Sequence, residues 1–233
     1  VYGSEALDYV VDEAVQIYGG MGYSAEAPID RAYRDSRINR IFEGTNEINR
    51  LLSADTAIKK AQKGDFDLFG KAKAIFDSID SLEDSDTEFD NYFEEKYHYI
   101  RNYKKTVLLV IHAFAERYRK NLINEQEIMM NVADIMMQIY MAESTLLRVD
   151  KMQKFFDEKH IQIYQDILDV FVYDASAKIA KSAKDALNST EEGERLERLT
   201  RAVEIFTRVA PIDVREARRH IADRLIYDTR YTF

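Results

Sequence analysis

The residue best placed to do chemistry is Glu43, which stands in the run Phe42-Glu43-Gly44-Thr45. Four of the chain's eight glycines lie between positions 19 and 44, in a sequence whose pattern otherwise predicts helices. Glycine in such a background usually marks positive φ or close approach of another group. Glu43 then has two interpretations: a solvated or capping carboxylate, or a general base that abstracts a proton from a substrate for which Gly44 leaves room. The spacing alone leaves both open.

Three helices must position this glutamate. Apolar residues repeat at three- and four-residue steps over residues 5–18, which predicts a helix that the pair Gly19-Gly20 ends. Pro28 can open a second helix, and Thr45 is a candidate N-cap for a third. The glycine turn after residue 18 is either a plain C-cap or a set of outward amides able to bind phosphate.

Two motifs, and the spacing between them, resemble the C-terminal segment of the flavin-dependent acyl-CoA dehydrogenases. They are Gln16-x-x-Gly19-Gly20-x-Gly22-Tyr23, followed by Arg34-Asp35, and Ile41-Phe42-Glu43-Gly44-Thr45-Asn46-Glu47-Ile48. The remainder is similar to the extra C-terminal helical domain of the very-long-chain subgroup, in the run 123–126 and the helix 132–140.

The resemblance implies roles residue by residue. Glu43 would remove the α-proton of an acyl-CoA thioester while a hydride passes to FAD, and its backbone N–H would polarise the thioester carbonyl. A water-poor pocket would have to raise the pKa of this glutamate to make it an effective base. The implied substrate contacts are Phe42 and Gly44; the implied FAD contacts are Thr45 and Glu47, with Gln16, Ile17, Tyr18, Gly19 and Gly20 meeting the FAD of a neighbouring subunit. Glu47 departs from the Gln of many members.

Composition narrows the function classes. The 233 residues carry a formal charge of −9, which disfavours nucleic acid as a partner. With no cysteine, a thiolate metal site or a disulfide framework is impossible, and a cytoplasmic location is expected. Residues 195–230 instead carry a net positive charge, with nine Arg against six Asp and Glu. That stretch is either a solvated face of four-residue ion pairs or a patch for an anionic membrane or partner.

The rest of the chain predicts further helices. A short helix over 68–79 and an acidic linker over 78–90 lead into long helices near 89–120, 125–156, 161–187, 194–209 and 214–227, with Asn124 as an N-cap. The apolar run 107–115 predicts the buried centre of a bundle. Six methionines between 129 and 152 either fill the core or line an adaptable groove. Glu95-x-x-His98 and Asp157-x-x-His160 imitate di-iron motifs, but the sequence favours no metal site.

We therefore predict an all-α chain: the end of a four-helix-bundle acyl-CoA dehydrogenase domain (1–64), a short helix and acidic linker (65–90), and a second helical-bundle domain (91–233). The chain is expected to be a fragment of an enzyme that uses FAD, an acyl-CoA and an electron acceptor, and that forms homodimers. Alone it should lack flavin and activity. The alternative is a non-catalytic helical module that docks the enzyme to a partner or membrane.

Overall fold

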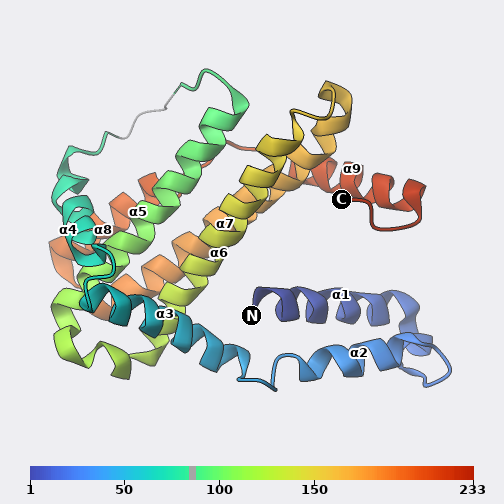
Figure 1. Cartoon of the computed structure of the whole chain (residues 1–233), viewed down its shortest axis with the longest axis horizontal. Coiled ribbons are helices and arrows are strands. Elements are labelled where there is room, and N and C mark those ends of the chain that lie inside the picture. The colour runs from blue at the N-terminus through green and yellow to red at the C-terminus, as the bar shows by residue number, and fades with distance from the viewer. Residues whose placement is uncertain (84–87) are drawn as a thin grey trace. The chain divides into compact units, whose positions relative to one another are not determined.

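The computed structural model describes residues 1–83 and 88–233, and this part of the chain contains nine α-helices and no strand, as the all-α prediction required (Figure 1). The helices are α1 (Tyr2–Tyr18), α2 (Ile29–Ile38), α3 (Asn46–Gln62), α4 (Leu68–Ser78), α5 (Tyr92–Tyr118), α6 (Gln126–Met152), α7 (Glu158–Thr190), α8 (Gly193–Phe206) and α9 (Val214–Asp228). Three 3-10 turns lie between them: η1 (Gly19–Tyr23), η2 (Ile79–Ser81) and η3 (Arg119–Asn124). The chain divides into two compact units, Val1–Lys59 and Lys60–Phe233.

The first unit is built on the antiparallel pair α1 and α2, joined through η1 (Figure 1). Pro28 is the N-cap residue of α2, where its missing N–H costs no hydrogen bond. The side chains of α1 bury little within this unit: Val11 is its one buried residue, and Tyr9 and Val10 are 66% and 60% exposed.

The second unit is a helical bundle around the three long helices α5, α6 and α7, against which α4, α8 and α9 pack. The predicted buried centre is confirmed, because every residue from Val107 to Phe114 except Leu108 is buried. The largest fully buried side chains come from four helices: Tyr103, Leu109 and Phe114 of α5, Met129, Ile135 and Leu146 of α6, Leu168, Ile179 and Leu187 of α7, and Leu199 and Phe206 of α8. Of the six clustered methionines only Met129 is buried, so that stripe fills the core in part.

Two predicted local features differ in the structure. Asn124 is not an N-cap: it ends η3, and α6 starts after Glu125 without a side-chain cap. Leu122 of η3 is buried, and the 3-10 turn extends through Asn124 up to the start of α6. The acid of Asp157-x-x-His160 is itself an N-cap, since its carboxylate accepts the His160 N–H at 2.9 Å and starts α7 three residues earlier than expected. Part of the predicted acidic linker, 84–87, lies outside the described residues.

Candidate functional site

Glu43 sits on the α2–α3 turn with a left-handed backbone. Its φ is +56°, and that of Gly44 is +87°. Positive φ costs a residue with a Cβ about 1 to 2 kcal/mol, so a glutamate adopts it where surrounding contacts impose it. The turn is closed by the Asn46 N–H, which donates to the carbonyl of Arg40 at 3.1 Å, and by the Asn49 side chain, which donates to the carbonyl of Gly44 at 2.7 Å. The Glu43 side chain itself is exposed, so these residues alone do not form the water-poor pocket expected around it.

A polar clamp from α1 fixes both sides of this turn. On one side, Arg40 donates to Asp8 at 2.7 Å. On the other, Asn46 is only 2% exposed, accepts from the Ser4 hydroxyl at 3.0 Å and donates to Glu5 at 3.3 Å.

One turn further along α3, Arg50 completes the clamp by making two contacts with the carboxylate of Glu5, at 2.7 and 2.9 Å. Sequence reasoning missed these residues. Their signal is a set of polar side chains at helical spacing: Ser4, Glu5 and Asp8 on α1, and Asn46 and Arg50 on α3. Spacing does not reveal which helix each set faces.

Thr45 and Glu47 lie at the N-terminus of α3, next to Glu43. The Thr45 hydroxyl accepts the Ile48 N–H at 3.3 Å, which confirms its capping role. The backbone N–H of Glu47 and the Thr45 hydroxyl hold the pKa of the Glu47 carboxyl below its usual value. Glu47 is therefore ionised and exposed, and it suits a hydroxyl donor better than a second anion.

The second predicted group, Gln16 to Gly20, forms the exposed C-terminal end of α1. Gly19 has φ +59° and its N–H donates to the carbonyl of Gln16, so this amide serves a plain C-cap. Ile17 and Tyr18 are 81% and 55% exposed. No atom lies within 4 Å of a Cβ built on Gly20, which leaves open space beside this backbone.

Gly22 supports this end of α1. A Cβ there would lie 2.5 Å from the backbone oxygen of Val15, which only glycine avoids.

The two groups lie at opposite ends of α1. The clamp around Glu43 starts at Ser4 and Glu5, whereas the glycine turn starts fourteen residues after Glu5. At 1.5 Å per residue this is about 21 Å of helix. The structure therefore brings Phe42 to Glu47 together and keeps Gln16 to Gly20 apart from them.

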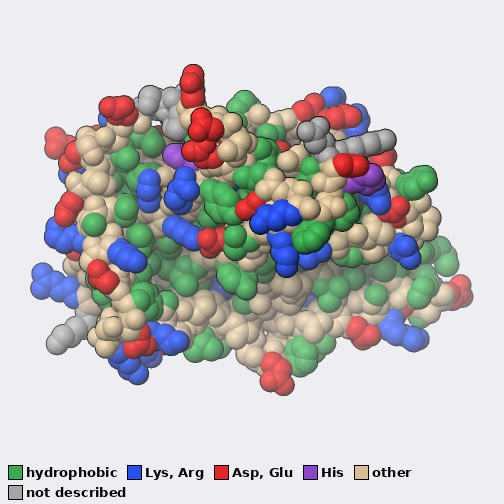
Figure 2. All heavy atoms as spheres, turned by 45° about the horizontal axis from the view of Figure 1, so that its top comes forward, with side chains coloured by type: hydrophobic (Ala, Val, Ile, Leu, Met, Phe, Trp, Pro, Cys, Tyr) green, Lys and Arg blue, Asp and Glu red, His purple; other side chains and the backbone are tan. Residues whose placement is uncertain are grey.

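The basic stretch 195–230 is largely paired with carboxylates. Some partners are near in sequence, such as Glu191 for Arg195 and Asp228 for Arg224, and others are distant. Arg198 contacts Asp80 and Arg218 contacts Asp174 at 2.9 Å, while Arg195 contacts Glu116. Acidic and basic side chains both occur across the face in Figure 2. These pairs support the solvated-face interpretation over an open cationic patch.

The described residues contain no group of three His, Asp or Glu arranged to hold a metal ion. The Glu95 carboxylate instead binds Lys96 and Tyr99. In residues 1–83 and 88–233, no helix is long and apolar enough to cross a bilayer.

Comparison with known proteins adds to this geometry. Two family models, each described as an acyl-CoA dehydrogenase C-terminal domain, match residues 1–58 and 102–204. The whole chain is 42% identical to a probable acyl-CoA dehydrogenase of Bacillus subtilis, of which it covers 39%. It also matches the crystal structure of an acyl-CoA dehydrogenase complexed with FAD from Bacillus anthracis, with a TM-score of 0.93 and 40% identity over the whole chain and 39% of that protein. A stretch of 54 residues, 23% of the chain and 8% of the relative, is 56% identical to the very long-chain specific acyl-CoA dehydrogenase of Rattus norvegicus.

The helical fold and the motif-bearing turn thus define an acyl-CoA dehydrogenase C-terminal region, matched in both units. The chain belongs to the acyl-CoA dehydrogenase family. It spans about 39% of the length of its full-coverage relatives. The similarity to the very long-chain enzyme is confined to a short stretch and does not define an acyl chain length.

Proposed function

We propose that this chain is the C-terminal part of an FAD-dependent acyl-CoA dehydrogenase, in which Glu43 is the general base. The observation that carries the proposal is the pair of consecutive left-handed residues, Glu43 and Gly44, held by the α1 clamp. Strained backbone that surrounding contacts over-determine is typical of functional sites. Family membership supports the same role.

In the reaction, the Glu43 carboxylate would take the α-proton of the acyl thioester. Negative charge then develops on the thioester carbonyl oxygen, and the backbone N–H of Glu43 would donate to it. Phe42 and Gly44 would contact the acyl-CoA on either side. FAD, when bound, supplies the acceptor for the β-hydride. Burial by the rest of the enzyme must supply the dry environment that the exposed Glu43 lacks here.

The residues present fit a flavin at two places. The start of α3, with Thr45 as its N-cap, presents a helix N-terminus, which favours phosphate oxygens. The end of α1 presents exposed Ile17 and Tyr18 and the open backbone of Gly20, which suit a flat ring system. Ionised Glu47 fits a ribityl or ribose hydroxyl.

About 21 Å of helix separates these two places, and the family resemblance assigns the second to the flavin of a neighbouring subunit. We propose that Gln16 to Gly20 contact the FAD of a second copy in a homodimer. The exposed apolar residues of α1, among them Tyr9 and Val10, support an assembly that covers them. The electron acceptor, peripheral membrane contact and the cytoplasmic location stay predictions.

Replacing Glu43 in the longer enzyme tests the proposal. Glu43→Gln keeps the size of the side chain but removes the proton acceptor, so turnover should fall by a factor of at least about 10² to 10⁴ with FAD content and acyl-CoA affinity unchanged. Glu26→Gln, on the exposed turn before α2, is the matched control and should retain parent activity. Near-parent turnover by an FAD-loaded Glu43→Gln enzyme would show that the base lies elsewhere.

A further inference from the structure

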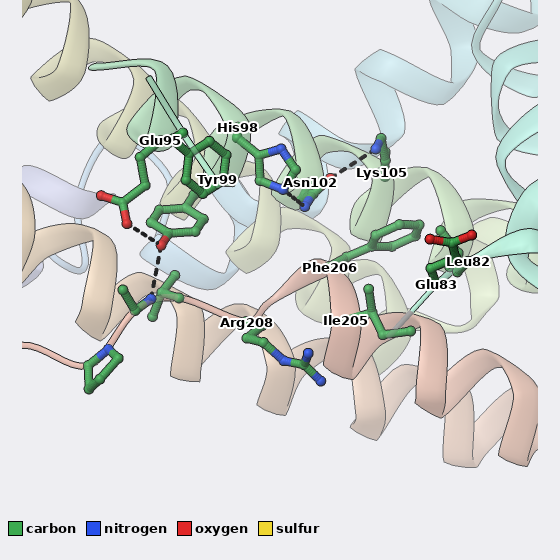
Figure 3. A pocket seen from close by; sticks show the side chains of 14 residues that line it. Leu82, Glu83, Glu95, His98, Tyr99, Asn102, Lys105, Ile205, Phe206 and Arg208 are labelled. Atoms are coloured by element: carbon green, nitrogen blue, oxygen red, sulfur yellow. Dashed lines mark hydrogen bonds between the residues drawn. The ribbon is translucent and has the colours of Figure 1, made fainter. Parts of the chain in front are cut away.

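The second unit holds a cavity of about 600 Å³, none of whose lining residues belongs to the first unit (Figure 3). One wall is a single face of α5, formed by Glu95, His98, Asn102 and Lys105, which recur at three- and four-residue steps. The opposite wall is apolar and comes from the end of α8, chiefly Phe206, and from the segment that follows it. A cavity of this size matches those that hold small organic ligands.

Among the described residues, Lys105 lines this cavity without an ion-pair partner. Its ammonium donates to the Asn102 side-chain oxygen at 2.9 Å and lies 5.3 Å from the centre of the Phe206 ring. No carboxylate among the described residues forms an ion pair with it. Burial, with Arg101 nearby, lowers the pKa of Lys105, which shows that its surroundings disfavour the charged form.

Two other lysines of α5 are each paired with a carboxylate, as buried or partly buried lysines usually are. Lys96 is more deeply buried but contacts two carboxylates, Glu95 at 2.7 Å and Asp169 at 3.0 Å. Lys104 pairs with Glu143 at 2.5 Å. A partly desolvated lysine without such a partner is costly, and an anion in the cavity would remove the cost.

We propose that this cavity binds an apolar monocarboxylate, whose carboxylate pairs with Lys105 and whose tail lies against the apolar wall at Phe206. The proposal does not rest on the role of Glu43, because every residue it uses belongs to the second unit.

The charges around the cavity select a single negative charge. Arg101 adds positive potential near Lys105. Burial, with Lys105 and Arg101 nearby, lowers the pKa of His98 and so favours its neutral form. His98 contacts the amide nitrogen of Asn102 at 2.9 Å, which orients the amide oxygen toward Lys105.

Arg208 also lines the cavity, together with the carboxylates of Glu83 and Glu95. Glu95 lies ten residues, or about 15 Å of helix, from Lys105, and they appear on opposite sides in Figure 3. The Glu95 carboxylate, held by Lys96 and Tyr99, disfavours a polyanion such as a nucleotide or CoA, whereas a single charge beside Lys105 lies away from it. The exposed Glu83 appears on the same side of Figure 3 as Lys105.

Calorimetric titration of the 233-residue chain with sodium octanoate, and separately with 1-octanol, tests the site. Octanoate should bind saturably with one equivalent per chain, and octanol, which has the same tail without the charge, should bind at least about tenfold more weakly. Absence of saturable octanoate binding up to millimolar concentration, or equal affinity for the two ligands, would overturn the proposal.

Substitution locates the site. Lys105→Met should weaken octanoate binding about ten- to hundredfold and leave octanol binding unchanged, while the matched control Lys104→Met should stay within twofold of the parent. Lys105→Gln is the second variant, and circular dichroism confirms folding of each. If both Lys105 variants bind octanoate as the parent does, the charge that holds it is not Lys105.

Discussion

Asn46→Ala should loosen the turn that carries Glu43 without unfolding the rest of the chain. The Asn46 side chain is 2% exposed and joins α3 to α1 through Ser4 and Glu5. Truncation removes both hydrogen bonds, although the Ser4 hydroxyl can still donate to the carbonyl of Val1 at 2.8 Å. Losing a buried polar contact of this kind costs about 1 to 3 kcal/mol.

The loss is local because the second unit does not use these bonds. If the turn exchanges its amide hydrogens by local opening, 1 to 3 kcal/mol corresponds to exchange faster by about 5- to 150-fold. Hydrogen–deuterium exchange with mass spectrometry should show this acceleration in peptides covering residues 39–50. Peptides from α5 and α7 should exchange as in the parent.

Ser53→Ala is the matched control, because the Ser53 hydroxyl is exposed and donates only to a carbonyl of its own helix. It should change exchange by less than about twofold, as surface substitutions usually change stability by no more than about 0.5 kcal/mol. The reasoning fails if Asn46→Ala leaves residues 39–50 as protected as in the parent, since the clamp would then not hold the turn.

Further predictions concern packing and pH. Gly22→Ala places a Cβ 2.5 Å from the Val15 oxygen and should destabilise the end of α1 by about 1 to 3 kcal/mol, measured as faster amide exchange over residues 15–23. Gly20→Ala meets open space and should leave this exchange unchanged. Equal effects of the two substitutions would contradict the contact between Gly22 and Val15. The hydrogen bond from Arg195 holds the pKa of Glu116 below its usual value, so this pair stabilises the fold above about pH 4.5 and the contribution is lost as the pH falls further. Thermal melts of Glu116→Gln should accordingly lose less stability than the parent between pH 6 and 3, and parallel curves would refute the assignment.

The sequence predicts helices well where the apolar repeat is regular. The repeat over residues 5–18 and the apolar run 107–115 correspond to α1 and to the centre of α5. The ends are less predictable, as Asn124 shows: this good capping residue ends a 3-10 turn that contains buried Leu122, and α6 starts after Glu125 without a side-chain cap. Asp157 shows the converse, because an acid read as part of a metal motif caps a helix.

The candidate site was predictable only in part. The motif gave the position of Glu43, and Thr45 acts as the expected cap. The contacts that hold the turn, Glu5 with Arg50 and Asp8 with Arg40, join residues more than thirty positions apart. Local spacing contains no information on such pairs. The same holds for Arg198, which pairs with Asp80 and not with the acid four residues before it, which the four-residue pattern would predict.

The length of α1 fixes both the distance and the relative rotation between the clamp residues at its start and the glycine turn at its end. One residue inserted between Asp8 and Gln16 would lengthen the helix by about 1.5 Å and turn one end by about 100° relative to the other. Either the acids that hold Arg40 and Arg50 or the glycine turn would then point in a wrong direction. Changes of length in this part of the chain are therefore expected outside α1, between Gly22 and the start of α2, away from the Gly22 contact with Val15 and from the clamped turn at Glu43.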